Sequence, residues 1–321
     1  MPLSDTQKTE DKERILVIKL SALGDFIQAL GPMAAIRNHH PNAHITLLTT
    51  PMFKSFGEKC GYFDTVTIDK RPNTFDISGW IKLRKNLVNG QYYRIYDLQN
   101  NDRTSFYFKL LPKNKKPEWV GIAKGASHRN TSPKRTSGNA FEGHKQTLNL
   151  AGINDVTIDK LAWVKEDLTH MGLKPPYVLF VPGSAPQHPN KRWPYKKYAQ
   201  LAKQLIQNNY QVVIIGTDAE KDITNAIEEI CPEVLNLTGK TSLFEIAALA
   251  HSADGAIGND TGPMHMIGPT GCPSLVIFSE NSNPKKHAPN GDNVHTIQKK
   301  RLEDLENDKV FESLKEIMRI K

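Results

Sequence analysis

The chain has 321 residues, 38% of them hydrophobic and 24% charged, so its composition excludes an intrinsically disordered protein and its length favours two domains. The longest apolar runs have four or five residues, as in Val212–Ile215 and Leu275–Phe278, whereas a membrane-spanning helix needs about 20. The three cysteines, at positions 60, 231 and 272, show no CxxC spacing, so neither a disulfide framework nor a zinc site is expected.

The formal net charge of +8 is concentrated in one stretch of the sequence. Between Arg103 and Lys145 stand ten Lys or Arg and two acids, while the rest of the chain is balanced, with 32 basic and 32 acidic residues. A local positive field of this kind is typical either of a solvated lysine-rich loop or of a docking surface for an anionic partner. Because the stretch lies in the first half, we expect any docking there to belong to the first domain.

The first half of the chain alternates strands and helices. Residues 1–14 are polar and lack the apolar segment of a secretory signal, which predicts a floppy tail on a cytoplasmic protein. Short apolar runs bounded by turn residues then predict strands, and amphipathic segments between them predict helices. The expected strands are Ile15–Leu20, Ile45–Leu48, Thr65–Ile68 and Arg94–Leu98, and the expected helices are about Asp25–His39 and Ile77–Val88.

The second half repeats this rhythm after a looser stretch that ends in the double proline Pro175-Pro176. Pro194 suits the first position of a helix that runs to about Asn209. The expected strands are Tyr177–Val181, Gln211–Gly216, Val234–Leu237, Gly255–Gly258 and Ser274–Phe278, and further helices are expected at Ala219–Ile230, Leu243–His251, after Gly262 and at Leu302–Ile320.

This alternation predicts an α/β protein with two doubly wound, Rossmann-like domains and a ligand cleft between them at the carboxyl ends of the strands. We expect the first domain to span residues 15–170 and the second to span residues 171–301. The final helix, residues 302–321, is expected to pack back on the first domain.

The loop after the first strand, Ser21–Asp25, places a carboxylate at the start of a helix. Asp25 is there either an N-cap, favoured by the helix dipole, or a general base that faces the cleft. No GxGxxG stands here, because Gly24 and Gly31 are seven residues apart, which disfavours a dinucleotide-dependent oxidoreductase.

Two loops of the second half carry the residues that suit a phosphate. In Asn259–Pro263 a glycine turn joins a strand to a helix, whose free amides could bind a diphosphate or simply mark the start of the helix. Lys191-Arg192 follows the loop Pro182–Ser184 and precedes a helix, so two cations lie near the end of a strand. His265 is either a packed histidine or a ligand contact.

Other chemistries lack their motifs. The sequence has no HExxH, no GxSxG and no P-loop, and it has no Asp-x-Asp motif with which many sugar transferases hold a divalent metal. A reaction without a metal or other cofactor is therefore favoured. Glu245 completes a capping box with Ser242, which explains it structurally, although it could also bind ribose hydroxyls.

Taken together, these motifs resemble the lipopolysaccharide heptosyltransferase family, which consists of inverting transferases with the GT-B fold. The resemblance runs from Ile15 to about Gly291 and rests on the order and spacing of the motifs. These are Ser21–Asp25, Asp97-Leu98-Gln99 with Arg103, Pro182–Ser184, Lys191–Pro194 and Asp260–His265.

The resemblance implies that Asp25 is the general base of a sugar transfer. It assigns the donor nucleotide sugar to Gly183, Ser184, Lys191, Glu245, Asp260, Thr261, Gly262 and His265, and the acceptor to Gly24, Asp97, Gln99 and Arg103. The implied function is transfer of heptose from ADP-heptose to a phosphorylated lipid A core acceptor, by a peripheral enzyme on the cytoplasmic face of an anionic membrane. The family's Gly-Pro-Thr after the strand ending at Phe278 is replaced here by Ser279–Pro284.

Two alternatives stay open. The same fold could use another nucleotide sugar or another glycan acceptor. An inactive scaffold that binds nucleic acid through the basic stretch is the weaker alternative, because only Phe106, Tyr107, Phe108 and Trp119 stand among its cations.

Overall fold

The computed structural model describes residues 13–184 and 189–318. Most of the expected tail lies outside the described residues, and the first strand already begins at Arg14. The chain forms two units, the first of which comprises the chain up to Ser21, Pro32–Ser132 and His144–Val156. The second comprises Ala22–Gly31, Pro133–Gly143 and the chain from Thr157 onward.

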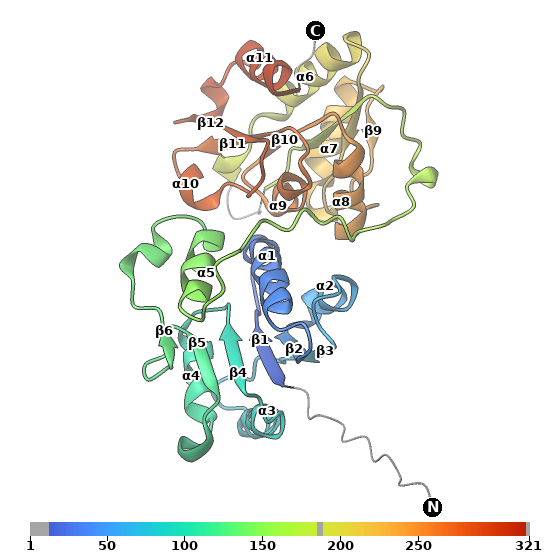
Figure 1. Ribbon diagram of the computed structural model, residues 1–321. Helices are drawn as coiled ribbons and strands as arrows, with labels where there is room; N and C mark the ends of the chain where they lie inside the picture. Colours follow the sequence, from blue (N-terminus) through green and yellow to red (C-terminus); the bar gives the residue numbers. More distant parts are fainter. Residues whose placement is uncertain (1–12, 185–188, 319–321) are drawn as a thin grey trace, which may run out of the picture. The chain divides into compact units, whose positions relative to one another are not determined.

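Unit 1 is built on a parallel sheet of six strands in the order β3-β2-β1-β4-β5-β6 (Figure 1). From β1 to β3 the strands are added toward one edge of the sheet, and from β4 to β6 they are added toward the other. The switch point of this doubly wound fold therefore lies between β1 and β4. The strands are β1 (Arg14–Ile18), β2 (His44–Thr49), β3 (Thr65–Ile68), β4 (Arg94–Asp97), β5 (Glu118–Gly121) and β6 (His128–Arg129). The helices of this half are α1 (Leu23–His39), α2 (Lys54–Lys59), α3 (Ile77–Asn89), α4 (Asp102–Leu110) and α5 (Ala140–Asn149).

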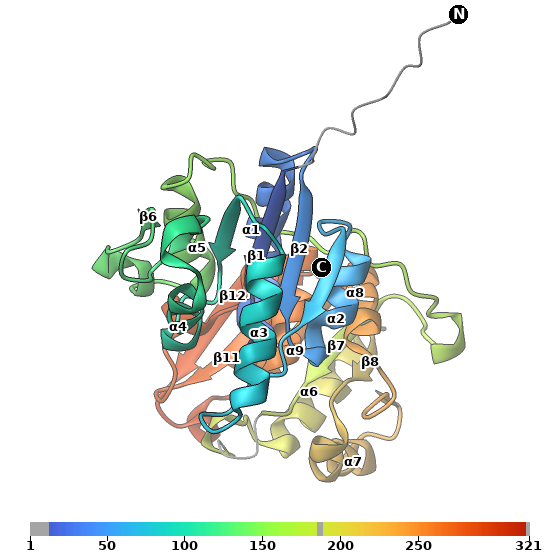
Figure 2. The ribbon, with the colours of Figure 1, turned by 90° about the horizontal axis from the view of Figure 1, so that it is seen from below.

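Helices α3 and α4 cover one face of this sheet, and Figure 2 shows both in front of the strands. Leu83 and Leu87 of α3, four residues apart, pack with Tyr107 and Phe108 of α4 on the buried side chains of β1 and β4. This spacing places the two leucines on one side of the helix. The opposite side of α3 contributes nothing to the core.

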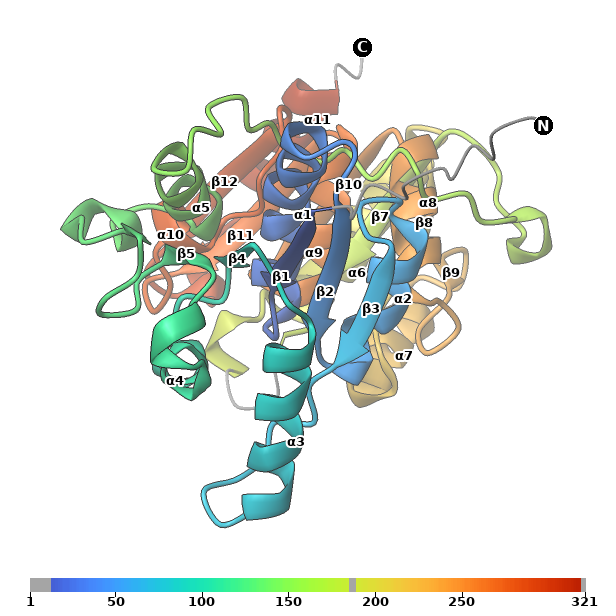
Figure 3. The same ribbon diagram turned by 60° about the horizontal axis from the view of Figure 1, so that its bottom comes forward.

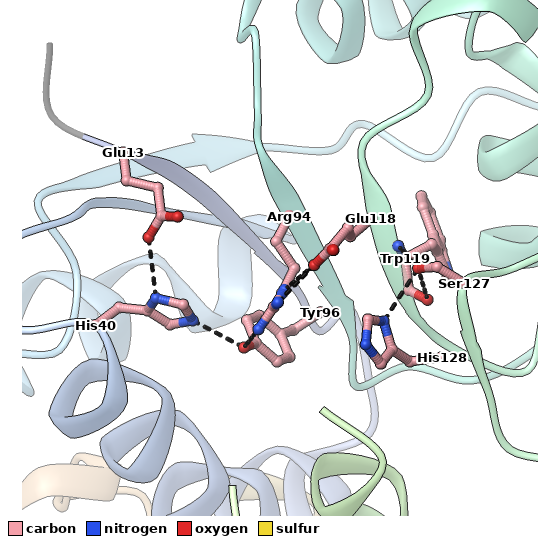
Figure 4. Close-up of polar contacts among 8 residues, drawn as sticks. All are labelled: Glu13, His40, Arg94, Tyr96, Glu118, Trp119, Ser127 and His128. Carbon is pink, nitrogen blue, oxygen red and sulfur yellow. Dashed lines mark hydrogen bonds and ion pairs between the residues drawn. The ribbon is translucent and has the colours of Figure 1, made fainter. Parts of the chain in front are cut away.

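A polar network ties the amino ends of the central strands of unit 1 together (Figure 4). The Arg94 side chain donates to Glu118 Oε2 at 2.6 Å and to the Tyr96 hydroxyl at 3.1 Å, and His40 Nε2 lies 2.8 Å from the same hydroxyl. Burial lowers the pKa of His40, so its ring is neutral at pH 7. Because active sites of such sheets lie at the opposite, carboxyl ends of the strands, we assign this network to stability.

Unit 2 has a second parallel sheet of six strands, in the order β12-β11-β10-β7-β8-β9 (Figure 1). Its switch point lies between β7 and β10. The strands are β7 (Tyr177–Val181), β8 (Gln211–Ile214), β9 (Leu235–Asn236), β10 (Gly255–Asn259), β11 (Ser274–Ser279) and β12 (Val294–Lys299). The helices are α6 (Tyr195–Gln207), α7 (Lys221–Ile230), α8 (Leu243–Ser252), α9 (Gly262–Ile267), α10 (Pro284–His287) and α11 (Asn307–Met318).

The final helix corrects one sequence-based expectation. Helix α11 packs within unit 2, against α6 and β11, whereas we expected it to pack on the first domain. Its Val310 and Leu314 are fully buried in the core that also holds Leu205 of α6. The amphipathic pattern predicted the helix correctly but carried no information on which apolar surface the helix would cover.

Two boundaries also differ from expectation. Pro194 is the N-cap of α6 in extended conformation, and the helix begins at Tyr195. The basic stretch from Arg103 to Lys145 is divided, because Pro133–Gly143 groups with unit 2, so it does not belong wholly to the first domain. None of the helices in the described part of the chain is both long and apolar enough to cross a bilayer.

Candidate active site

A polar pocket of about 380 Å³ lies within unit 2, next to the switch point of its sheet. It is lined by residues from the start of α1, from the loops after β7 and β10, and from α9 and α10. Seven residues singled out from the sequence line it together: Gly24, Asp25, Lys191, Asp260, Thr261, Gly262 and His265. The other lining residues are Ala22, Leu23, Gln28, Lys286 and His287.

An ion pair joins the two loops that flank the switch point. Lys191 Nζ, after β7, donates to Asp260 Oδ2, after β10, at 2.7 Å. The same oxygen accepts a bond of 2.6 Å from the Ser282 hydroxyl. The Asp260 side chain is only 10% exposed, so its carboxylate is nearly buried between these two partners. The pair therefore fixes a cation at the edge of the pocket.

Asn259, the last residue of β10, forms hydrogen bonds that fix the loop after β7, which carries Lys191. Its amide nitrogen donates to the Pro182 carbonyl at 2.6 Å, and its amide oxygen accepts from the backbone N–H of Trp193 at 3.0 Å. The side chain is fully buried, so these bonds are shielded from competition by water. Asn259 thus positions the chain on either side of Lys191.

Asp25 stands in the first turn of α1, two residues after the helix begins at Leu23, and is therefore not the N-cap residue that one sequence reading made it. Its side chain is exposed and lines the pocket. Within the described residues its carboxylate has no hydrogen-bond or ion-pair partner. A carboxylate without a structural partner in a polar pocket is available to accept a proton.

His265 of α9 lies against the turn that carries Asp25. A Cβ atom on Gly24 would come within 2.9 Å of the His265 ring, so a side chain at position 24 would displace the ring. Burial lowers the pKa of His265, although Asp260 and Asp25 raise it in part, so the imidazole is neutral at pH 7. Its buried Nδ1 has no hydrogen-bond partner in the part of the chain described.

The turn before α9 offers backbone donors. Thr261 is extended and precedes the helix, which begins at Gly262 with Pro263 in its first turn. Pro263 has no N–H, and the Met264 N–H donates to the Thr261 carbonyl at 3.2 Å. The N–H groups of Thr261 and Gly262 are therefore the donors left at the start of the helix, and both residues line the pocket together with Lys191 and Lys286. The site therefore combines amide donors with two lysines and suits an anion.

Besides Gln28 of α1, sequence reasoning missed three contributors to this pocket in the second half of the chain. Lys286 and His287 of α10 line it, and Ser282 holds Asp260. All three lie in or just after Ser279–Pro284, where the sequence departs from the family pattern. That departure was the only sequence signal for them.

Other predicted donor residues lie outside the pocket. Ser184 is fully buried and its hydroxyl accepts a bond of 3.1 Å from Arg192 Nε, while the Gly183 carbonyl accepts from Asn259. Glu245 forms the expected capping box, with its Oε2 accepting from the Ser242 N–H at 2.7 Å. These residues shape the loops around the site but do not line it.

The predicted acceptor residues of unit 1 are engaged in internal hydrogen bonds. Gln99 Oε1 accepts from the backbone N–H of Leu20 and Ser21, at 2.8 and 3.1 Å. Gln99 therefore positions the chain that leads into the turn carrying Asp25. Arg103 donates from both terminal nitrogens to the Pro72 carbonyl at 3.2 Å, which places it against the loop after β3.

Asp97 is fully buried at the end of β4, so direct contact with an acceptor, as expected from the sequence, does not fit its position. Its Oδ1 accepts from the N–H groups of Gln99 and Asn100 at 3.1 and 3.0 Å. Burial raises the pKa of Asp97 to about 6, although these bonds and Lys19 act in the opposite direction. The geometry gives Asp97 a bracing role for the turn that carries Gln99.

The raised pKa of Asp97 makes stability depend on pH. Between its ordinary value of 3.8 and about 6, the folded state holds a proton that the unfolded state has lost, so stability falls as pH rises through this range. The Asp97→Asn variant lacks this titration, and its stability relative to the natural chain should rise between pH 4 and pH 7 by up to about 3 kcal/mol. Urea unfolding at both pH values measures the difference. An equal difference at the two pH values would contradict a buried, titrating Asp97.

Two parallel six-stranded sheets, with a polar pocket at the switch point of the second, define the GT-B fold class of glycosyltransferases. The structure of E. coli ADP-heptose lps heptosyltransferase II matches with a TM-score of 0.74 at 21% sequence identity, covering 95% of this chain and 98% of that one. The sequence model of glycosyltransferase family 9 (heptosyltransferase) matches residues 80–316, and the chain belongs to this family.

Curated relatives agree with this assignment. The lipooligosaccharide heptosyltransferase 2 of Haemophilus influenzae is 34% identical over 128 residues, which are 38% of this chain and 36% of that protein. The chain thus spans about a third of the length of the heptosyltransferase 2 relatives it matches. The lipopolysaccharide core heptosyltransferase OpsX of the same organism is 23% identical over 312 residues, with 90% of this chain and 86% of that protein aligned. The family resemblance expected from the motifs is therefore confirmed.

Proposed function

We propose that the protein transfers heptose from ADP-heptose to a phosphorylated lipid A core acceptor, with inversion at the anomeric carbon. The observation that carries this proposal is a polar pocket that gathers Lys191, the Thr261-Gly262 turn and Asp25, whose carboxylate has no partner among the described residues. Family membership, and a fold shared with a protein described as an ADP-heptose heptosyltransferase, support the choice of donor.

The donor diphosphate is proposed to lie between Lys191, Lys286 and the amides of Thr261 and Gly262. Lysines supply point charges to phosphate oxygens, and the helix amides add directed hydrogen bonds. The neutral His265 would add no charge to this set, since its pKa is lowered by burial. The carboxylate of Asp260 is held toward the same space and is proposed to accept from hydroxyls of the donor sugar.

Asp25 is proposed to remove the proton of the acceptor hydroxyl. That oxygen then forms a bond to the anomeric carbon while the bond from this carbon to the diphosphate oxygen breaks, and ADP leaves with both electrons of that bond. The proton stays on the Asp25 carboxyl until solvent takes it. The fixed lysines stabilise the negative charge that develops on the leaving diphosphate, because they are already oriented before the reaction begins.

The acceptor of such a reaction is anchored in a lipid layer, so we propose that the protein works as a peripheral enzyme at the cytoplasmic face of a membrane. In this scheme Gln99 and Asp97 act by holding the turn before Asp25, and Arg103 holds the loop after β3. The resemblance assigned these three side chains to the acceptor, whereas we propose that they position the loops around the site.

A thermal-shift screen with ADP-, UDP-, GDP- and CMP-linked sugars tests the donor. ADP-heptose at 100 times its Kd should stabilise the protein by about 2.7 kcal/mol, which raises Tm by several degrees, while the other nucleotides should do so less at equal concentration. A larger shift with a UDP or GDP sugar would favour the second candidate, a family 9 fold with another donor. Ser279–Pro284, which departs from the family pattern beside the pocket, is the observation that keeps that candidate open.

A further inference from the structure

Unit 1 exposes large apolar side chains on one short stretch of chain. Phe75 in the loop before α3 is 91% exposed, and Ile77 and Ile81 of that helix are 71% and 63% exposed. Ile77 and Ile81 are four residues apart and therefore lie on the same side of α3, away from Leu83 and Leu87 in the core. Figure 3 shows α3 and the loop before it projecting from the rest of unit 1.

The loop that carries Phe75 is built to hold this position. The Phe75 N–H donates to Asn73 Oδ1 at 2.9 Å, and Trp80 Nε1 of α3 donates to the Asn73 carbonyl at 2.9 Å. The Arg103 guanidinium donates two hydrogen bonds to the Pro72 carbonyl, and it lies 5.5 Å from the centroid of the Trp80 ring. The aromatic ring of Phe75 is thus presented to the outside by a braced loop.

Aromatic side chains border the apolar strip of Phe75, Ile77 and Ile81. The half-buried Trp80 packs edge-on against Phe106 of α4, with ring centroids 5.1 Å apart, and Phe106 is itself 43% exposed. Trp and Phe with one face against protein and one toward the outside are typical of side chains that settle at a membrane interface.

The same segment is basic. From position 70 to 89 the sequence has five Lys or Arg and a single acid, Asp76. The Asp76 carboxylate is taken up as the N-cap of α3, accepting from the Gly79 N–H at 2.8 Å. All five cations are exposed beside the apolar strip: Lys70, Arg71, Lys82, Arg84 and Lys85.

We propose that α3 and the loop before it dock on an anionic phospholipid surface, with Phe75, Ile77 and Ile81 among the acyl chains and the five cations at the headgroups. An apolar strip on a basic amphipathic helix matches such a surface in both polarity and charge. A second copy of this face would set cations against cations, which disfavours a dimer here. The inference rests on the proposed function, because a lipid-linked acceptor brings the enzyme to a membrane.

Vesicle flotation tests the apolar strip. The natural chain should float with phosphatidylcholine vesicles that contain phosphatidylglycerol, and the triple variant Phe75→Ser, Ile77→Ser, Ile81→Ser should bind them at least about tenfold more weakly. The control triple Met52→Ser, Leu150→Ser, Ile230→Ser replaces exposed apolar residues elsewhere and should bind as the natural chain does. Equal binding by all three proteins would overturn the proposal.

The charge is tested by Lys82→Gln with Lys85→Gln. Binding to vesicles with phosphatidylglycerol at low salt should fall by about tenfold or more, since each cation near such a surface strengthens binding and salt screens it. Binding to phosphatidylcholine alone should not change. A drop on the neutral vesicles of the same size would show that the lysines do not act through anionic headgroups and would overturn that part of the proposal.

Two further measurements separate this proposal from its rivals. Affinity for ADP and turnover on a delipidated, soluble core acceptor should be the same for the triple variant and the natural chain, so failure of the proposed function appears in those assays alone. If the triple variant has a lower Tm than the natural chain, the single variant Phe75→Ser, at the most exposed of the three positions, is used in its place. The lipid proposal would be refuted if the natural chain did not bind vesicles but self-associated in sedimentation velocity while the triple variant stayed monomeric. This face would then be a contact between copies of the chain.

Discussion

Replacing Asp25 with Asn is expected to lower turnover by at least about 100-fold, the scale of general-base catalysis, while leaving ADP affinity unchanged. The substitution keeps the shape of the side chain and removes its ability to accept a proton. Because the carboxylate has no structural partner in the described part of the chain, the fold should not be affected. Initial rates with saturating donor and acceptor, together with calorimetric titration of ADP, measure the two effects separately.

Asp222→Asn is the matched control for this experiment. Asp222 is also an exposed carboxylate in the first turn of a helix, α7, but it does not line the pocket. It reports on the effect of losing one helix-dipole interaction, which is worth about 0.3–1 kcal/mol of stability. If Asp25→Asn retained turnover close to that of Asp222→Asn, Asp25 would not be the base and another proton acceptor would have to be sought.

Most of the sheet strands were predictable because a parallel sheet buries its strands on both faces. Runs such as Tyr177–Val181 are apolar throughout, and the structure places that strand at the predicted residues. The strand Val294–Lys299 was missed for the opposite reason. It lies at the edge of its sheet with only Ile297 buried, so its sequence lacks the apolar run that marks a central strand.

Part of the candidate site was predictable because charged residues and a glycine turn directly after a strand, or before a helix, indicate an anion site. Lys191, Asp260 and the Thr261-Gly262 turn were found in this way, and the structure brings them together. Burial was not predictable, because the sequence around Asp97 reads the same whether the carboxylate faces a ligand or the protein interior. Only the structure shows that the side chains of Asp97 and Gln99 accept hydrogen bonds from backbone N–H groups.

Lys191→Met is expected to reduce kcat/KM by about 30-fold, equivalent to about 2 kcal/mol, as expected on losing a charge-assisted bond to the donor diphosphate. The ion pair with Asp260 complicates a single substitution, because removing the lysine also leaves a nearly buried carboxylate without its cation. Lys197→Met is the matched control, since Lys197 is 23% exposed against 21% for Lys191 and also faces a carboxylate.

The double variant Lys191→Met, Asp260→Asn separates the two roles of this lysine. If Lys191 served only to neutralise Asp260, removal of the carboxylate charge would restore donor binding, because Ser282 can still hold the Asn side chain. If Lys191 binds the diphosphate, as we propose, the double variant stays impaired toward ADP. Binding of adenosine, which lacks the diphosphate, should be equal in the natural chain and both variants. Calorimetric titrations of ADP and adenosine measure this contrast, and an equal loss for both ligands would show that Lys191 shapes the pocket and does not neutralise the leaving group.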